Sequence, residues 1–232
     1  MRASWDEQQI NNSRLEVMTS CRPTQPSTGF SLIIDDSGHR KSAPPAARFP
    51  RRKDGARSGN FTSGVGRQYI GEIGKTENGI VVVTTHLYDG VKSLPLDIEL
   101  DQHANSLPQG KTDPEFLKKP EIALNLIERS LKRKYRPGIV IVDSGYGNNT
   151  SFLQKLENRK LNYLGGIAKN RKVTQNQHGS LRSIRMDELA QGLPQEAFTE
   201  VELNLDKPKK VWVTTLQVEL SKLEGIRSEE SS

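Results

Sequence analysis

The sequence predicts an α/β domain built on a mixed β-sheet with helices on its faces. First, four β-branched residues in a row at 139–142 (IVIV) suit a strand buried on both faces, as in parallel sheets flanked by helices. Second, an amphipathic helical pattern at 120–134 directly precedes that strand. Third, strand-like segments with turn signals come before the helix, so we expect antiparallel strands that lead into helix-separated parallel ones.

The length and composition indicate one intracellular domain with extensions. A chain of 232 residues can bury one full core and part of a second. The formal net charge of +6 fits a polyanionic partner. Cys21 is the only cysteine, which excludes a disulfide framework and suits a reducing cytoplasm. No apolar run reaches membrane-spanning length and the polar N-terminus lacks a signal-peptide core, so we expect a cytoplasmic location and no membrane partner.

The first part of the chain contains one weak helix, one strand and two irregular stretches. A helical pattern surrounds Ile10, Leu15 and Met18, and a linker rich in Pro, Ser and Thr follows at 21–28. The first stable strand is expected from Ser31 to the aspartates that close its apolar run. The following stretch has several prolines and basic residues and no periodicity, so we predict that residues 43–58 form an inserted, disordered loop.

The middle of the chain predicts an antiparallel meander. Residues 66–73 and 80–88 are strand-like, and the Asn78-Gly79 pair favours a tight hairpin turn between them. A third strand is expected at 93–100. The polar segment 103–120 contains Gly-Lys-Thr, but it lacks the earlier glycine and the preceding strand that a phosphate-binding loop requires.

The remaining elements follow in order. The helix at 120–134 ends before a Pro-Gly pair, the strand at 139–142 ends at Asp143, and a flexible glycine-rich loop leads to a helix at 150–160 capped by Asn149 or Thr150. A strand is expected at 162–168, an irregular region with one helical turn at 173–194, and a hairpin from 199–205 and 211–220. The predicted organisation is an N-terminal segment and linker at 1–29, a compact core at 30–172, a β-rich region at 173–225 and a disordered tail at 226–232.

Acidic residues follow two of the predicted strands. Asp143 comes directly after 139–142, and Asp35 and Asp36 close the apolar run that begins at Ser31. Ligands of open α/β sheets bind beyond the carboxyl ends of the strands, so these carboxylates converge if the two strands lie side by side and parallel. Hard oxygen ligands suit Mg²⁺ or Mn²⁺, and an ion would offset the repulsion between the carboxylates. An Asp after a strand is also a common helix cap or turn former, and this alternative stays open.

A basic cluster follows the last predicted strand of the core. Lys169, Arg171 and Lys172 are expected near the same sheet edge as the aspartates, where they could neutralise phosphate groups. A solvated turn explains these residues equally well.

Three long segments carry a resemblance to a known family. They are IIDDSGHRKS at 33–42, GNFTSGVGRQYIGEIGKTENGIVVVTTHLYDG at 59–90 and DPEFLKKPEIALNLIERSLKRKYRPGIVIVDSGYGNN at 113–149. Together they resemble DDE transposases of bacterial insertion sequences, within the RNase H-like superfamily. The resemblance implies an RNase H-like mixed sheet, with a three-stranded meander joined to helix-alternating strands and a β-rich insertion at the C-terminal end. It also implies that Asp35 and Asp143 fill the first two acidic positions, with Asp36 as the close alternative for the first.

The same resemblance implies a chemistry and a set of partners. The family cuts and joins DNA by phosphoryl displacement, with two Mg²⁺ or Mn²⁺ ions about 4 Å apart bridged by carboxylates. The implied partners are the transposon ends and the target DNA, an active relative would be a homodimer, and the protein would be nucleoid-associated. The residues expected to bind DNA are His39, Arg40, Lys41, Arg67, Lys169, Arg171 and Lys172.

Two departures from the family pattern shape the expected function. No helix with a third acidic residue follows Leu220, since Glu219, Glu224, Glu229 and Glu230 lie on a strand or in the tail. The family's N-terminal end-recognition region is largely absent. We therefore expect a truncated transposase, inactive alone, and the alternative is a non-catalytic DNA-binding remnant. A phosphoryl-accepting receiver or phosphatase also pairs acids with Mg²⁺, but the predicted antiparallel hairpins between the acids argue against it.

Overall fold

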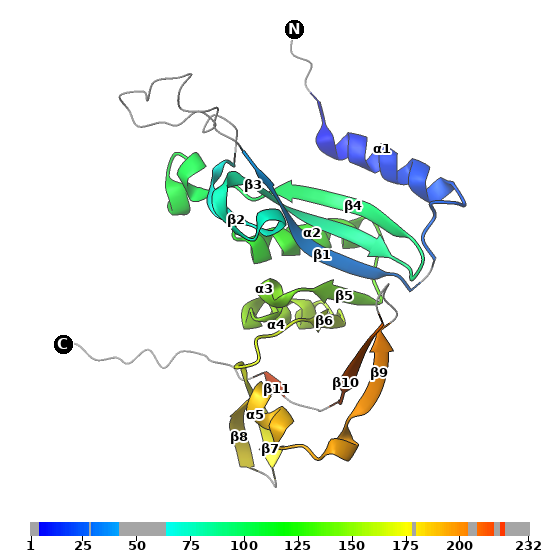
Figure 1. Cartoon of the computed structure of the whole chain (residues 1–232). Helices are drawn as coiled ribbons and strands as arrows, with labels where there is room; N and C mark the ends of the chain where they lie inside the picture. Colours follow the sequence, from blue (N-terminus) through cyan, green and yellow to red (C-terminus); the bar gives the residue numbers. More distant parts are fainter. Residues whose placement is uncertain are drawn as a thin grey trace, which may run out of the picture. The chain divides into compact units, whose positions relative to one another are not determined.

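A computed structural model describes residues 5–27, 29–41, 64–177, 180–203, 208–215 and 219–220 (Figure 1). The predicted loop at 43–58 and the tail at 226–232 lie outside these ranges. The chain divides into two compact units, residues 1–166 and residues 167–232, which are described separately below. No helix in the described part of the chain is long and apolar enough to cross a bilayer.

The first unit is organised around a six-stranded mixed sheet, as the sequence predicts. Its central strand β1 pairs antiparallel with β3 on one side and parallel with β5 on the other. Strand β3 also pairs antiparallel with β2 and β4, and β5 pairs parallel with β6. The strand bounds are β1 Ser31–Arg40, β2 Gly66–Ile70, β3 Lys75–Tyr88, β4 Ser93–Leu100, β5 Ile139–Val142 and β6 Tyr163–Gly165.

The main helices of the first unit begin at capping and proline residues that can be recognised in the sequence. Helix α2 (Lys119–Lys132) has proline in its first turn, and its apolar stripe, which includes Leu126, is buried. Helix α4 (Thr150–Asn158) is capped by Asn149, whose side chain accepts a hydrogen bond from the Phe152 amide. Both predicted helices are confirmed. The unit also contains α1 Glu7–Ser20, α3 Ser144–Gly147 and short 3₁₀ turns at Gly71–Ile73, Ala104–Ser106 and Gly110–Thr112.

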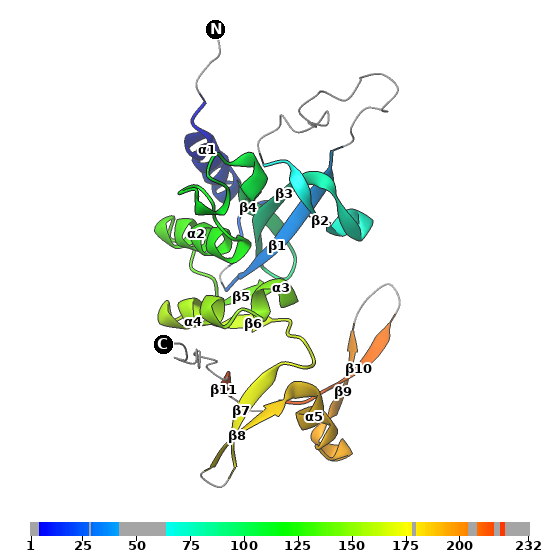
Figure 2. The ribbon, with the colours of Figure 1, turned by 90° about the vertical axis from the view of Figure 1, so that its left-hand side faces the viewer.

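The core lies between the sheet and helices α2 and α4, which pack on the same face (Figure 2). Leu32 and Ile34 of β1, Val83 of β3 and Val140 of β5 are at most 1% exposed on that face. Burial of each such side chain stabilises the fold by about 1.5–3 kcal/mol. The opposite face carries no helix in the described part of the chain, and its Ile98 is 58% exposed. We call it the open face of the sheet.

Helix α1 is held at the β4 edge by polar contacts. The Arg14 guanidinium donates hydrogen bonds to the backbone carbonyl groups of β4, including that of Leu96. The buried carboxylate of Asp97 forms an ion pair with Arg133 at 2.6 Å, and Arg133 also donates to Asn12 of α1. The end of α2, the middle of β4 and α1 are therefore joined through one buried acid.

Strand β1 extends past the point where the sequence predicts its end. Its pairing with β5 stops at Ile34, but its pairing with β3 continues to Arg40. Asp35 and Asp36 therefore lie within the strand, and the prediction that they close it is wrong. The apolar run marks only the part of β1 that is flanked by strands on both sides and covered by helices.

The predicted hairpin turn at Asn78-Gly79 is also wrong, because both residues lie inside β3. The chain turns earlier, through the 3₁₀ turn at 71–73 and Gly74, whose φ of 64° favours glycine. Gly79 is needed for another reason: a Cβ there would lie 2.5 Å from the carbonyl oxygen of His39 on β1. The glycine therefore permits close strand approach and does not form the turn.

The second unit consists of short hairpins and one helix. The prediction of an irregular region at 173–194 is wrong where the β7–β8 hairpin forms, whereas the helical turn predicted near 186–189 is confirmed as α5. Strand β7 reads KVTQNQ, and a strand with so few apolar residues has no alternation for the sequence to reveal. The hairpin predicted at 199–220 is confirmed with shorter strands. The elements are β7 Lys172–Gln177, β8 Ser180–Arg185, α5 Met186–Gln191, a 3₁₀ turn at Gln195–Ala197, β9 Thr199–Leu203, β10 Lys209–Val213 and β11 Glu219–Leu220.

Candidate active site

Two aspartates lie side by side where strands β1 and β5 part. The parallel register pairs Ile34 with Val142, and the next residues of the two strands are Asp35 and Asp143. Neighbouring strands lie about 4.8 Å apart, so these two positions are adjacent in the sheet. After Asp143 the chain turns into α3, while β1 continues along β3. The two aspartate positions are therefore neighbours, as the sequence predicts, although β1 does not end there.

Strand alternation places these two aspartates on the open face. Leu32 and Ile34 of β1 are buried under the helices, so Asp35 between Ile34 and Asp36 belongs to the opposite face. In β5, Val142 is buried, and the extended backbone of Asp143 continues the alternation. Asp35 and Asp143 are both exposed. Asp36, the predicted alternative to Asp35, belongs to the helix-covered face.

Each of the two exposed aspartates is held by one carboxylate oxygen. Oδ1 of Asp143 accepts hydrogen bonds from the backbone amides of Gly145 at 2.9 Å and Tyr146 at 3.4 Å, and so caps α3. Oδ1 of Asp35 accepts from the Asp36 amide at 2.8 Å. Within the described chain, Oδ2 of each aspartate accepts no hydrogen bond. The alternative interpretation of Asp143 as a helix cap is therefore correct, but capping occupies only one of its oxygens.

Asp36 is engaged by two side chains on the helix-covered face. Lys119 at the start of α2 places its Nζ 2.7 Å from Oδ2, and the hydroxyl of Tyr146 in α3 donates a hydrogen bond to Oδ1. Tyr146 is buried, and its ring lies 5.7 Å from that of Phe152. Asp36 therefore connects β1 to α2 and α3 through its two side-chain contacts.

The three carboxylates gather around Tyr146. Burial raises the pKa of Tyr146, and so do its hydrogen bond to Asp36 and the negative charges of Asp36, Asp143 and Asp35. The phenol therefore stays protonated and keeps donating its hydrogen bond. Nearby, burial raises the pKa of Asp101, and the positive charge of Lys119 partly offsets that rise. Tyr146, Lys119 and Asp101 were not predicted as site residues, although Tyr146 is the one large apolar ring in an otherwise glycine- and asparagine-rich loop.

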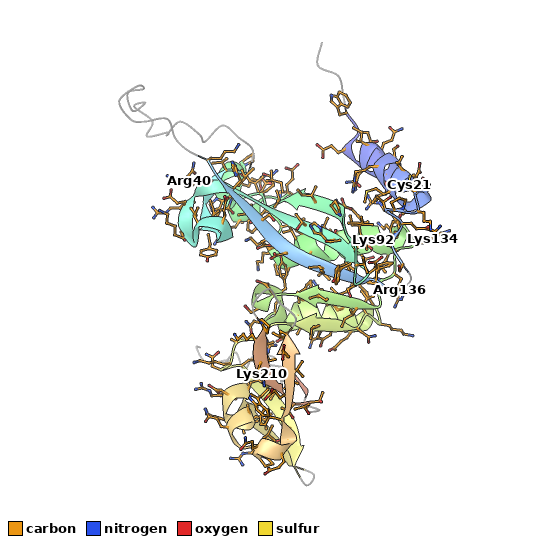
Figure 3. The ribbon with its side chains drawn as sticks, turned by 45° about the vertical axis from the view of Figure 1, so that its right-hand side comes forward. Cys21, Arg40, Lys92, Lys134, Arg136 and Lys210 are labelled. Atoms are coloured by element: carbon orange, nitrogen blue, oxygen red, sulfur yellow. The ribbon has the colours of Figure 1, made fainter. Side chains whose placement is uncertain are left out.

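The predicted DNA-binding residues divide between the two faces. His39 lies on the open face with Asp35, and the strand pairings put Arg67 of β2 there too, next to the position of Lys41. Arg40, at the far end of β1 in Figure 3, belongs to the other face and pairs with Glu77 at 3.1 Å. The remaining three predicted residues belong to the second unit: Lys169, Arg171 and Lys172.

The acidic pair fits part of a divalent metal site. Among the described residues, no three His, Cys, Asp or Glu side chains gather as ligands. Asp35 and Asp143 nevertheless offer two hard oxygen atoms on adjacent strands, and Mg²⁺ is commonly held by one or two carboxylates with water completing its shell. The donor set therefore suits Mg²⁺ or Mn²⁺ bound through two protein ligands.

The family model and the similar protein found by comparison indicate the same class of protein. The family model described as DDE superfamily endonuclease matches residues 55–218. The chain is 32% identical over 170 residues to a probable transposase for insertion sequence element IS701 from Microchaete diplosiphon. That alignment covers 73% of this chain and 39% of the relative, so the chain spans about two fifths of the relative's length. No solved structure gives a significant match.

Proposed function

The chain belongs to the DDE superfamily of endonucleases, and on this basis we propose that it carries two metal-binding acids of a transposase that cuts and joins DNA. The observation that carries the proposal is the position of Asp35 and Asp143, adjacent on the open face, where one oxygen of each accepts no hydrogen bond from the described residues. Asp35, and not Asp36, is then the first acid of the family's Asp-Asp-Glu set.

The strand order supports an RNase H-like core. The path β4-β3-β1-β5-β6 has three antiparallel strands followed by two parallel ones, and helices α2 and α4 connect the parallel part. This order supports the meander joined to helix-alternating strands that the resemblance implies, with β1, β3 and β4 as the meander in place of the predicted strands at 66–73, 80–88 and 93–100. We propose that the first unit is this core.

The chemistry needs a metal at the acidic pair and DNA over the open face. A bound Mg²⁺ or Mn²⁺ would lower the pKa of the attacking water or hydroxyl and neutralise charge at the phosphorus centre. Asp35 and Asp143 would hold it. His39, Lys41 and Arg67 lie on the same face and would bind the DNA phosphates. Arg40 would contribute little, because it pairs with Glu77 on the other face.

A second candidate function is DNA binding without cleavage. It is favoured by one observation: the described residues supply two acids at this site and no third ligand of the same kind. This candidate predicts sequence-indifferent binding that weakens steeply with salt, because phosphate contacts release counterions.

A nicking assay on supercoiled plasmid tests the proposal. In contrast to the sequence-based expectation of a chain that is inactive alone, the two acids should support slow nicking with Mn²⁺ and none with EDTA, and Asp35→Asn and Asp143→Asn should each lose more than about a hundredfold in rate. Asp36→Asn should lose less, because Asp36 lies on the other face. Nicking that persists in Asp143→Ala would count against this site. Salt-sensitive DNA binding by every variant, with no nicking by any, would support the second candidate instead.

A further inference from the structure

The link between Tyr146 and Asp36 joins the two segments that carry the acidic pair. Tyr146 lies three residues after Asp143 in the same helical turn, and Asp36 directly follows Asp35. The Tyr146 hydroxyl donates to the Asp36 carboxylate across the gap between α3 and β1. The two segments meet through this link after the β1–β5 ladder has ended at Ile34 and Val142.

Burial and charge make this link a strong one. Tyr146 is 3% exposed, so water competes little for its hydroxyl. Its acceptor is a carboxylate oxygen, and hydrogen bonds to carboxylates are about twice as strong as neutral ones. Lys119 lies 2.7 Å from the same carboxylate and compensates its charge, and the Phe152 ring fixes the tyrosine ring from α4.

The turn that carries Asp143 is also confined on its other side. A Cβ at Gly147 would lie 2.1 Å from the carbonyl oxygen of Gly166, and the Gly166 amide donates to the carbonyl of Val142 at 3.2 Å. The turn therefore fits between the exit of β6 and the link to β1. A change at either contact must move the turn, and with it the Asp143 side chain that caps it.

We propose that Tyr146 is a positioning residue whose hydrogen bond to Asp36 holds the α3 turn against β1 and so sets the separation of the Asp35 and Asp143 carboxylates. This inference rests on the proposed function, because only a metal-binding pair needs a fixed separation. It gives the two consecutive aspartates different tasks: Asp35 binds the metal, and Asp36 anchors the turn that carries the second ligand.

The test compares Tyr146→Phe with Tyr163→Phe. The first variant keeps the buried ring and removes only the hydroxyl. The second is a matched control, since the Tyr163 hydroxyl also donates to a carboxylate, that of Glu157 at 2.7 Å, within the same unit. Amide hydrogen exchange is measured at Gly145 and Tyr146, whose N–H groups donate to Asp143, and Leu126 in α2 reports global opening. Mn²⁺ affinity is measured by calorimetry on the same proteins.

We expect exchange at the Gly145 and Tyr146 amides to rise about tenfold in Tyr146→Phe relative to Leu126, and Mn²⁺ affinity to fall about tenfold. Tyr163→Phe should change neither quantity. Exchange rates at the turn that equal those of the wild type, or that rise only in step with Leu126, would overturn the inference. If the wild type bound no Mn²⁺, the proposed metal site would fail, and the exchange data would still decide whether the hydroxyl holds the turn.

Discussion

The two units of the chain differ in how much apolar surface they bury. The first contains a helix-covered sheet face whose side chains, such as Leu32 and Leu126, are fully buried. In the described part of the second unit the buried hydrophobic residues are Val173 and Leu189. Its β9–β10 hairpin leaves Leu203 40% exposed and Trp212 56% exposed. A two-stranded hairpin is marginally stable alone in water.

This difference indicates where precise geometry can be maintained. Close-packed interiors transmit small displacements, whereas exposed hairpins absorb them. The acidic pair lies where the central strands β1 and β5 of the packed sheet part, and it is fixed through buried groups on the helix-covered face. We therefore expect equivalent substitutions to cost far more in the first unit than in the second.

The largest difference in stability loss between the two units is expected for large-to-small substitutions of apolar residues. Leu126→Ala should lower the free energy of unfolding by about 2–5 kcal/mol, because it leaves a cavity under the sheet. Leu203→Ala should lower it by less than about 1 kcal/mol, because that side chain is already 40% exposed. Urea unfolding followed by circular dichroism measures both. Equal losses would show that the hairpin is packed as tightly as the core.

A smaller difference is expected for charged pairs. Asp97→Asn should cost about 2–3 kcal/mol, because it leaves the partly buried Arg133 without its buried carboxylate partner. The matched change in the second unit is Glu200→Gln, which breaks an exposed pair with Lys210 at 2.6 Å and should cost less than about 1 kcal/mol. Thermal unfolding at low and high salt checks the pair, and only the Glu200 effect should depend clearly on salt.

The smallest difference in stability is expected for glycine substitutions. Gly147→Ala should cost about 1–3 kcal/mol, because its Cβ would meet the Gly166 carbonyl, and it should also weaken Mn²⁺ binding by moving Asp143. Gly192→Ala in the second unit should be close to neutral, since its φ is −79° and the added Cβ would lie 3.6 Å from the nearest carbonyl oxygens. Unfolding and Mn²⁺ titrations of the two variants measure this. Unchanged Mn²⁺ binding in Gly147→Ala would show that the position of the α3 turn does not control metal binding at Asp143.

Much of the first unit could be predicted from the sequence because its apolar pattern is strong. The strand at 139–142 and helix α2 follow directly from buried side chains, and so does the placement of Asp143. The assignment of Asp35 and Asp36 to opposite faces was not predicted, because the strand was expected to end at these residues, and its continuation past Ile34 depends on pairing with β3, a strand distant in the sequence. Tyr146 was missed for the same reason, since its partner lies on another strand.

The second unit could be predicted less well. The β9–β10 hairpin alternates apolar and polar residues and was found, whereas β7 has only Val173 as an apolar residue and was not. The overlong β3 was also missed, because its 14 residues are defined by pairing with three different strands. Local pattern identifies strands whose apolar and polar residues alternate, and it fails for strands that are held mainly by their partners.

The most direct test of the central claim is Mn²⁺ titration of the ¹⁵N-labelled chain, with paramagnetic broadening of amide signals as the readout. We predict that signals near the acidic pair, including Gly145, broaden first, and that Asp35→Asn and Asp143→Asn each abolish this broadening while Asp36→Asn weakens it. The account would be contradicted if broadening survived Asp35→Asn and disappeared in Asp36→Asn, since the metal would then lie on the helix-covered face.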